Sequence, residues 1–289
     1  MLQDSGTDGN LDHPMTMLTQ TLGFIGGGNM ARSLIGGLIA RGIKPEQIIV
    51  SDPAPTQRDG LSAEFGIRVT DDNSFAARAS QVVVLAVKPQ ELRSVATQLA
   101  PSLTHRPVVL SVAAGIRAAD LRKWLGELPV VRCMPNRPAL NGAGVTGLFA
   151  TSDVDSSAKE LAAEILGAVG PALWVDLEAQ MDVVTAVSGS GPAYFFLLIE
   201  MLEASGTQLG LPAEVARRLA IETAYGAGIM AKTATESPAT LREQVTSKGG
   251  TTEAALKSLE EAKVRDIFAD AVAAAAKRSA ELAEQLSKQ

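Results

Sequence analysis

Short apolar runs alternate with amphipathic stretches over the first 177 residues of the chain. Five runs predict buried strands, at 22–25, 48–50, 82–87, 108–112 and 130–133. Between the runs, apolar residues such as Leu34 and Leu38 recur at helical spacing. Continuous apolar strands separated by amphipathic helices indicate a parallel sheet that helices cover on both faces. Segments 145–149 and 172–175 are candidates to extend this sheet.

The alternation stops after Leu177, and the rest of the chain predicts helices only. Long stretches rich in alanine and leucine cover 181–187, 194–204, 214–232 and 263–286. The last stretch is apolar on more than one face, so several neighbours must bury it, and we expect a second copy of the chain among them. The predicted fold class is therefore α/β. A disordered leader covers 1–20, a parallel sheet domain 21–177 and an all-helical dimerisation domain 178–289.

The composition excludes several classes of function. The 32 acidic and 26 basic residues, with 4% aromatic residues, argue against binding to nucleic acid. No apolar run is long enough to span a bilayer, and residues 1–20 do not resemble a signal peptide. The single cysteine, Cys133, suits a reducing compartment. We expect a cytoplasmic protein with a small-molecule ligand, no metal site, and no nucleic-acid or membrane partner.

A glycine-rich turn follows the first predicted strand. Gly26, Gly28 and Ala31 match the G-x-G-x-x-[G/A] pattern of dinucleotide-binding proteins. Gly26 permits the tight turn, Gly28 lets the backbone approach a pyrophosphate, and Ala31 allows close packing of helix on strand. Asn29 and Met30 begin the helix and belong to the predicted cofactor contacts. The strand, turn and helix together predict a Rossmann-type site rather than a plain glycine-rich turn.

The second predicted strand ends at Asp52. An acid at this place usually accepts hydrogen bonds from the adenosine ribose of NAD, whereas Arg58 could reach the 2′-phosphate of NADP. The competing interpretation of Asp52 is a turn residue before Pro53. The sequence predicts NADPH or NADH as the cofactor and does not choose between them.

Two further segments reach the carboxyl edge of the predicted sheet, where open α/β sheets bind ligands. Val87, Lys88 and Pro89 follow one strand, and Lys88 could face the dinucleotide or be a solvated lysine. Asn136 follows another strand. It could orient the nicotinamide or the substrate, or it could cap a turn after Pro135.

A second glycine motif lies at Thr246–Thr252, just before a helical pattern. Gly249 and Gly250 stand among four hydroxyl side chains. The first N–H groups of a helix have no partners inside the helix, so such a segment can wrap them around a small anion. A capped turn without a ligand is the alternative. Neither histidine is a candidate acid, because His13 lies in the leader and His105 precedes a strand at the opposite edge.

These motifs together resemble those of pyrroline-5-carboxylate reductases. The resemblance covers roughly residues 21–285 and rests on the segments 24–31, 87–89, 132–136, 188–194 and 246–252. The last two segments are the most specific. The family commonly has proline where this chain has Lys248, which can loosen the turn and adds a positive charge. Asp52 is a second departure, because the family often uses NADPH.

The resemblance implies a reaction and its residues. Hydride transfer from NAD(P)H would reduce the cyclic imine 1-pyrroline-5-carboxylate to L-proline, the last step of proline biosynthesis. Thr252 Oγ would hydrogen-bond the ring nitrogen, as the catalytic group. The remaining substrate-binding residues would be Ser247, Gly249, Gly250, Thr251, Ser190 and Gly191.

The resemblance also implies a homodimer at least. Each active site would combine the nucleotide domain of one chain with the helical domain of its partner. The family also forms a decameric ring, which this sequence does not reveal.

Two other functions compete with this prediction. A 3-hydroxyisobutyrate-type NAD(P) dehydrogenase has similar domains but needs a catalytic lysine on the first long helix of the second domain, and residues 177–211 contain no lysine. A non-catalytic NAD(P)H-binding dimeric scaffold would not need the hydroxyl groups of Thr246–Thr252 (the hydroxyl cradle). Changing Thr252 would then have no effect on its function. We predict the reductase.

Overall fold

The computed structural model describes residues 19–288, and the chain divides into two compact units. One unit runs up to Gly189 and resumes at Ala276, and the other is Ser190–Ala275. The predicted leader over residues 1–20 lies outside the described residues except for its last two positions.

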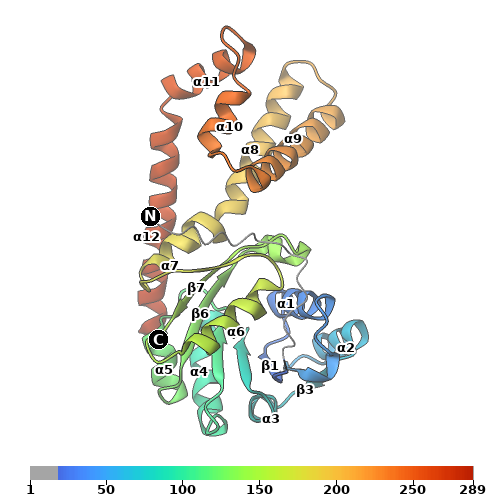
Figure 1. The fold of residues 1–289 in the computed structure, drawn as a ribbon, viewed down its shortest axis with the longest axis vertical. Coiled ribbons are helices and arrows are strands. Elements are labelled where there is room, and N and C mark those ends of the chain that lie inside the picture. Colours follow the sequence, from blue (N-terminus) through green and yellow to red (C-terminus); the bar gives the residue numbers. More distant parts are fainter. Residues whose placement is uncertain (1–18, 289) are drawn as a thin grey trace, which may run out of the picture. The chain divides into compact units, whose positions relative to one another are not determined.

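An eight-stranded sheet forms the centre of the first unit (Figure 1), in the order β3-β2-β1-β4-β5-β6-β7-β8. The strands are β1 (Leu22–Ile25), β2 (Ile48–Ser51), β3 (Arg68–Thr70), β4 (Val82–Leu85), β5 (Val108–Ser111), β6 (Val130–Pro135), β7 (Thr146–Ala150) and β8 (Ala172–Trp174). The strands from β3 to β6 are parallel, β7 is antiparallel to β6, and β8 is parallel to β7. The order reverses at β1, which is the doubly wound Rossmann arrangement that the sequence predicts.

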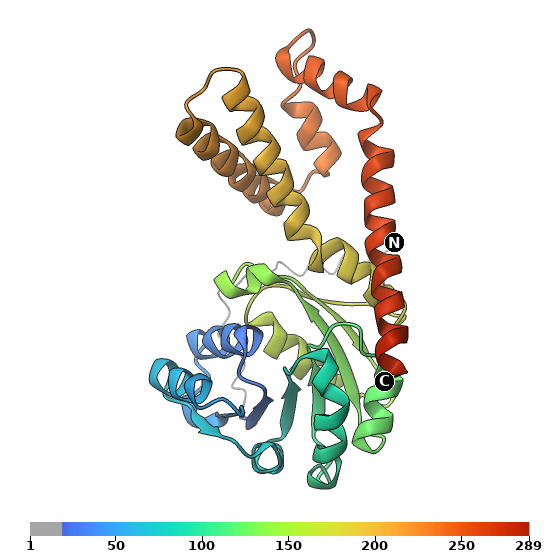
Figure 2. The same ribbon diagram turned by 180° about the vertical axis from the view of Figure 1, so that it is seen from behind.

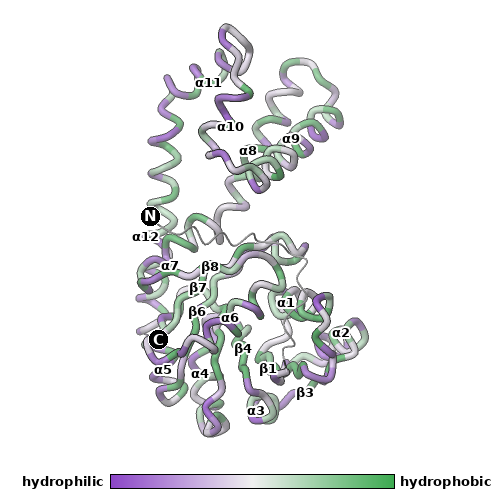
Figure 3. The backbone as a smooth tube through the Cα atoms, viewed as in Figure 1, coloured by the Kyte–Doolittle hydropathy of each residue, from purple (hydrophilic) through white to green (hydrophobic). Residues whose placement is uncertain are grey.

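Helices cover both faces of this sheet (Figure 2). They are α1 (Asn29–Ala40), α2 (Pro55–Phe65), α3 (Asn73–Arg78), α4 (Pro89–Leu99), α5 (Ala118–Leu125) and α6 (Ser156–Gly167). Successive strand residues point to opposite faces, so Phe24 packs with α1, α2 and α6, whereas Ile25 packs with α3, α4 and α5. Burial on both faces is why the strands are continuous apolar segments (Figure 3).

Three short elements, β3, α3 and α10 (Pro238–Gln244), are not predicted by the sequence pattern. The strand β3 has only three residues and lies at the edge of the sheet, with none of them buried. It therefore carries no apolar run, and its pairing with β2 places it, for example through Val69 opposite Val50.

The first unit also holds segments that the sequence assigns to the helical domain. The helix α7 (Gln180–Val184) packs on β7 so closely that a Cβ on Gly147 would lie 2.4 Å from Val184 Cγ1. The end of α12 (Val264–Ser287) is tied to α7 by a 2.7 Å hydrogen bond from Ser279 Oγ to Asp182 Oδ1. The compact unit thus differs from the predicted domain boundary after residue 177, because α7 packs on β7 across that boundary and the end of α12 joins the same unit through α7.

The second unit consists of helices with almost no interior. Its helices are α8 (Gly191–Gln208), α9 (Ala213–Thr233), α10, α11 (Thr251–Glu261) and the first part of α12. Among residues 190–275 only Gly191, Ala216 and Ala220 are buried. Large apolar side chains of α8 are exposed instead, among them Phe195 at 66% and Phe196 at 63%.

One described segment, Gln180–Gln208, has the length and composition of a membrane-crossing helix. Its most apolar window has a mean hydropathy of 1.4 and is 11% buried. The expectation that no segment is long enough is therefore wrong by this criterion. The segment includes Asp182, Glu200 and Glu203, and a core helix passes the same test, so the finding is weak evidence for a membrane span.

Candidate functional site

The glycine-rich turn after β1 has the geometry that its sequence predicts. Gly26 has φ +99° and donates a 2.7 Å hydrogen bond to the Ser51 carbonyl. A Cβ at this position would lie 2.8 Å from the Ala86 carbonyl carbon. Both the conformation and the space therefore require glycine at Gly26.

Gly28 is the N-cap of α1 and faces open space. Its φ of −70° and ψ of −174° are open to any residue, and a Cβ built on it meets nothing within 4 Å. No side chain caps α1, so the N–H groups that begin with Asn29 and Met30 remain directed past this glycine. An uncapped helix start behind an open glycine fits the pyrophosphate of a dinucleotide.

Asp52 and Arg58 lie together where β2 ends. The Asp52 carboxylate accepts hydrogen bonds from the N–H groups of Gly27 (2.8 Å) and Ala54 (2.9 Å), so it braces the glycine-rich turn. Arg58 Nη1 donates to the carbonyl oxygens of Asp52 (2.7 Å) and Pro53 (3.0 Å). Both side chains are half-buried beside the turn, and their predicted contacts with the ribose or the 2′-phosphate of a dinucleotide stay predictions.

Val87, Lys88 and Pro89 lie next to the glycine-rich turn. The Ala86 N–H donates to the Ile25 carbonyl at 2.8 Å, which holds the end of β4 against the end of β1. Lys88 is the exposed N-cap of α4, and Pro89 takes the first helical position, where a missing N–H costs nothing. These three residues therefore lie at the carboxyl edge of the sheet beside Gly26.

Asn136 is buried at the end of β6, and its amide is already bonded within the protein. Its Oδ1 accepts from the Val145 N–H at 2.9 Å, and its Nδ2 donates to the Ser188 carbonyl at 3.2 Å. The side chain thus ties β6 to the π-helical turn Thr185–Gly189. These bonds support a positioning role, and the predicted contact with the nicotinamide or substrate stays a prediction.

The π-helical turn lies tightly against the sheet edge. A Cβ on Gly189 would lie 2.8 Å from Met134 Cε, so a larger residue at this position would have to displace the end of the Met134 side chain. Single π-helical turns are frequently found at functional sites. Ser190 and Gly191 follow directly and begin the second unit, with Gly191 opening α8.

A part-buried ion pair holds the segment before α7 against β6. Arg132 Nη1 lies 2.6 Å from Glu178 Oε1, which also accepts from the Ala118 N–H at 2.6 Å. The sequence motif contains Arg132 but indicates no role for it or for Glu178. The residues are 46 positions apart, and no local signal links them. Next to Arg132, burial raises the pKa of the Cys133 thiol far above its usual value, so the reactive thiolate form is disfavoured at neutral pH.

The second glycine motif forms a tight turn in front of α11. The Gly250 N–H donates to the Ser247 carbonyl at 3.0 Å, and Gly249 has φ +72°. Gly250 is the N-cap of α11 and has no side-chain cap. The N–H groups of Thr251 and Thr252 follow at the open helix start, and the Thr252 side chain is half-buried. An uncapped helix start of this kind suits a small anion, and the predicted substrate contacts of this segment stay predictions.

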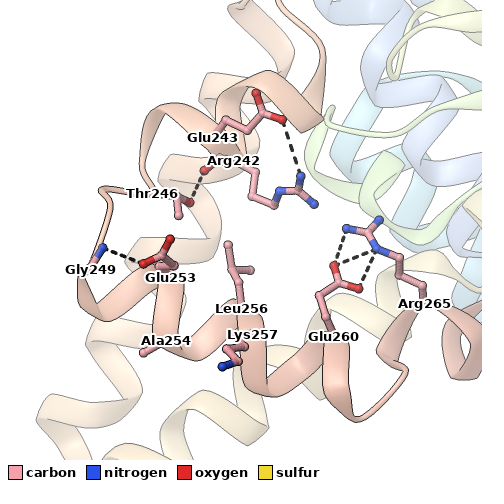
Figure 4. Close-up of a pocket in the computed structure, with 11 residues that line it drawn as sticks. Arg242, Glu243, Thr246, Gly249, Glu253, Ala254, Leu256, Lys257, Glu260 and Arg265 are labelled. Atoms are coloured by element: carbon pink, nitrogen blue, oxygen red, sulfur yellow. Dashed lines mark hydrogen bonds and ion pairs between the residues drawn. The ribbon is translucent and has the colours of Figure 1, made fainter.

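Glu253 closes this turn from the side of α11 (Figure 4). Its Oε2 accepts a 2.6 Å hydrogen bond from the Gly249 N–H. The predicted substrate contact of this N–H is thus taken by the protein's own carboxylate. A glutamate at the third helical position is a known capping signal, so the sequence could have revealed Glu253.

An open cavity of about 810 Å³ lies beside the turn, between α10, α11 and the start of α12. Gly249, Gly250 and Glu253 line it together with Arg242 (Figure 4). At its far end Arg265 and Glu260 form an ion pair of 2.7 Å, and the hydrogen bonds from Arg265 hold the pKa of Glu260 below its ordinary value.

The structure groups the predicted site residues into two sets. The nucleotide set, from Gly26 to Asn136, converges in the first unit, and the hydroxyl cradle lies in the second unit. His105 lies before β5, with its Nε2 2.8 Å from the Ser80 carbonyl, as expected for a residue outside the site. Within residues 19–288 no cluster of three or more His, Cys, Asp or Glu side chains could hold a metal ion.

Two family models match separate parts of the chain. Residues 178–282 match the family model described as pyrroline-5-carboxylate reductase dimerisation, and residues 21–115 match the model described as NADP oxidoreductase coenzyme F420-dependent. A pyrroline-5-carboxylate reductase of Pseudomonas aeruginosa is 51% identical over 94% of this chain and 100% of its own length.

Solved structures give the same result. A pyrroline-5-carboxylate reductase from Coxiella burnetii has a TM-score of 0.89 and 44% identity, covering 91% of this chain and 98% of that one. A Plasmodium falciparum pyrroline carboxylate reductase with NADP bound has a TM-score of 0.80 and 30% identity, covering 92% and 99%.

Proposed function

This chain belongs to the pyrroline-5-carboxylate reductase family, and we propose that it reduces 1-pyrroline-5-carboxylate to L-proline with NAD(P)H. The observation that carries the proposal is the 51% identity to a reductase of that name across its entire length. NAD(P)H, when bound, supplies a hydride to the imine carbon, and a proton on the ring nitrogen completes the amine. A protonated imine already accepts hydride readily, so the protein mainly has to position the two reactants.

The first unit would hold the dinucleotide. Its pyrophosphate would lie at the uncapped start of α1, in the open space before Gly28. The adenosine ribose would lie near Asp52 and Arg58. Val87, Lys88 and Pro89 would line the path to the nicotinamide, and Asn136 would hold the π-helical turn of Ser188 beside it.

The second unit would hold the substrate. The carboxylate would bind at the start of α11, where Gly250 leaves the N–H groups of the first turn uncapped. Ser247 would add its hydroxyl, and Thr252 Oγ would hydrogen-bond the ring nitrogen and keep the imine oriented. Ser190 and Gly191 would approach the ring or the nicotinamide.

The protein would act as an oligomer of at least two chains, with each site built from the nucleotide unit of one chain and the helical unit of another. The near absence of buried residues among 190–275 supports this proposal, because helices with exposed Phe195 and Phe196 need an apolar partner surface. A second copy would also explain the apolar Gln180–Gln208 segment without a membrane. We further expect a cytoplasmic enzyme.

A 3-hydroxyisobutyrate-type dehydrogenase is not favoured. The family membership argues against it, and residues 177–211 lack the lysine that such an enzyme needs. A non-catalytic scaffold would bind NAD(P)H equally well, and only an activity measurement separates it from the reductase.

The test is oxidation of NADPH and of NADH by the purified protein in the presence and absence of 1-pyrroline-5-carboxylate. Oxidation that depends on the imine acid, with proline as the product, would support the reductase. The ratio of the two rates would identify the cofactor that Asp52 and Arg58 select. A folded protein that oxidises neither cofactor would refute the proposal.

A further inference from the structure

The turn that begins the substrate cradle is a type II turn whose second residue, Lys248, does not restrain φ as proline would. The hydrogen bond from Gly250 to Ser247 closes it, Lys248 takes its second position, and Gly249, at φ +72°, its third. Lys248 is not among the described residues with positive φ, which identifies the turn as type II. Proline favours the second position because its ring fixes φ, and lysine provides no such restraint.

Glu253 supplies a restraint from outside the turn. Its carboxylate accepts the Gly249 N–H at 2.6 Å, and both side chain and turn are exposed to solvent. The bond joins the most mobile residue type of the turn to the third residue of α11. It therefore fixes the orientation of the Lys248–Gly249 peptide at the centre of the turn, directly before Gly250 and the first-turn donors.

We propose that Glu253 is a positioning residue that holds the turn in its binding conformation, in the role that proline at 248 would otherwise fill. This inference rests on the proposed function of the cradle. Glu253 directs the Gly249 N–H back toward α11, and the substrate carboxylate uses the remaining donors, the Ser247 hydroxyl and the N–H groups at the start of α11.

The main expectation concerns KM for the imine acid. Glu253→Ala removes the acceptor, so the turn samples other conformations and KM rises about three- to tenfold, the range of one solvent-exposed hydrogen bond to a charged group. The kcat changes less than about twofold, because the substrate, once bound, has the same position relative to Thr252 and the nicotinamide. Glu253→Gln keeps an acceptor oxygen and stays near the wild type.

Rescue by proline distinguishes positioning from direct charge effects. Lys248→Pro is compatible with the turn, since no hydrogen bond of the Lys248 N–H occurs in the described part of the chain. In the Glu253→Ala background it restores KM to within about threefold of the wild type, because it limits φ without restoring a carboxylate. Glu261→Ala is the matched control, as an exposed glutamate of α11 with only a 3.9 Å pairing to Lys257.

The experiment measures kcat and KM of these variants, together with deuterium uptake of the segment 245–256. We expect faster exchange and higher KM in Glu253→Ala, and reversal of both by Lys248→Pro. An unchanged or lowered KM in Glu253→Ala would overturn the proposal, the second result indicating that Glu253 competes with the substrate. Failure of Lys248→Pro to rescue either quantity would also overturn it.

Failure of the proposed function would be recognised separately. If the wild type does not reduce the imine acid, the exchange measurement alone still decides whether Glu253 holds the turn. If the wild type is active and the variants exchange alike, the reductase stands and the positioning role of Glu253 is refuted.

Discussion

The Asn136 amide donates a 3.2 Å hydrogen bond to the Ser188 carbonyl, from 52 positions away in the chain. The same side chain accepts the Val145 N–H at 2.9 Å, so one buried amide joins β6, the start of β7 and the π-helical turn. A motif that the sequence suggests for ligand contact is thus used to hold the backbone beside the proposed ligand.

Asn136→Ala should destabilise the protein by about 2 kcal/mol, because it takes the hydrogen-bond partner from the part-buried Val145 N–H and from the Ser188 carbonyl. Asn136→Asp keeps the acceptor for Val145 but sets a carboxylate against the Ser188 carbonyl, so it should also destabilise. Chemical denaturation with and without NADPH measures both effects. Wild-type stability of Asn136→Ala would contradict the positioning role.

Gly28→Val should abolish NADPH binding while leaving the fold intact. Any residue can adopt the backbone conformation of Gly28, and the added side chain enters only the open space before α1. Gly26→Val is the contrasting variant, because its φ of +99° and the nearby Ala86 carbonyl forbid a side chain. Calorimetric titration and circular dichroism separate the two. Normal NADPH affinity in Gly28→Val would refute the nucleotide site.

Thr252→Ala should lower kcat by about 10- to 1000-fold and leave NADPH affinity nearly unchanged, because only the hydroxyl at the ring nitrogen is lost. Thr97→Ala is a suitable control, since that exposed hydroxyl bonds only the Arg93 carbonyl of its own helix at 2.8 Å. Steady-state kinetics with the imine acid measures the effect. A turnover equal to that of the control would favour the scaffold interpretation.

Two inactive variants should complement each other if the sites are shared between subunits. Co-refolding Gly28→Val with Thr252→Ala in equal amounts gives mixed dimers in which one of the two sites is intact, so activity should recover to about a quarter of the wild type. Each variant refolded alone is the control. No recovery, with mixed dimers demonstrated by mass spectrometry, would assign each site to a single chain.

Phe196→Asp should weaken the oligomer, because Phe196 is 63% exposed in the single chain and belongs to helices without an interior. A charge there would have to be buried against the partner. Phe75→Asp applies the same change to a residue of α3 that is 48% exposed and should leave the mass unchanged. Light scattering after size exclusion measures both. An unchanged oligomer in Phe196→Asp would remove this face from the interface.

The end of α12 belongs to the first unit although the rest of this helix belongs to the second, and the sequence pattern does not reveal this. The sequence identifies α12 as a helix buried on several faces, but its last turns join the first unit through Ser279 and Asp182, 97 positions apart. Helical spacing reveals that a face is buried and not which surface buries it. The same limit applies to Arg132 and Glu178.

By itself, the sequence determines the features that depend on neighbouring residues. Buried strands such as β4 must be continuous apolar runs, and the turn at Gly26 must carry a glycine because of its positive φ. The tertiary structure alone decides the pairing of the short edge strand β3 and the use of Asn136 as a bridge. These depend on segments that the fold brings together, and no spacing along the chain encodes that proximity.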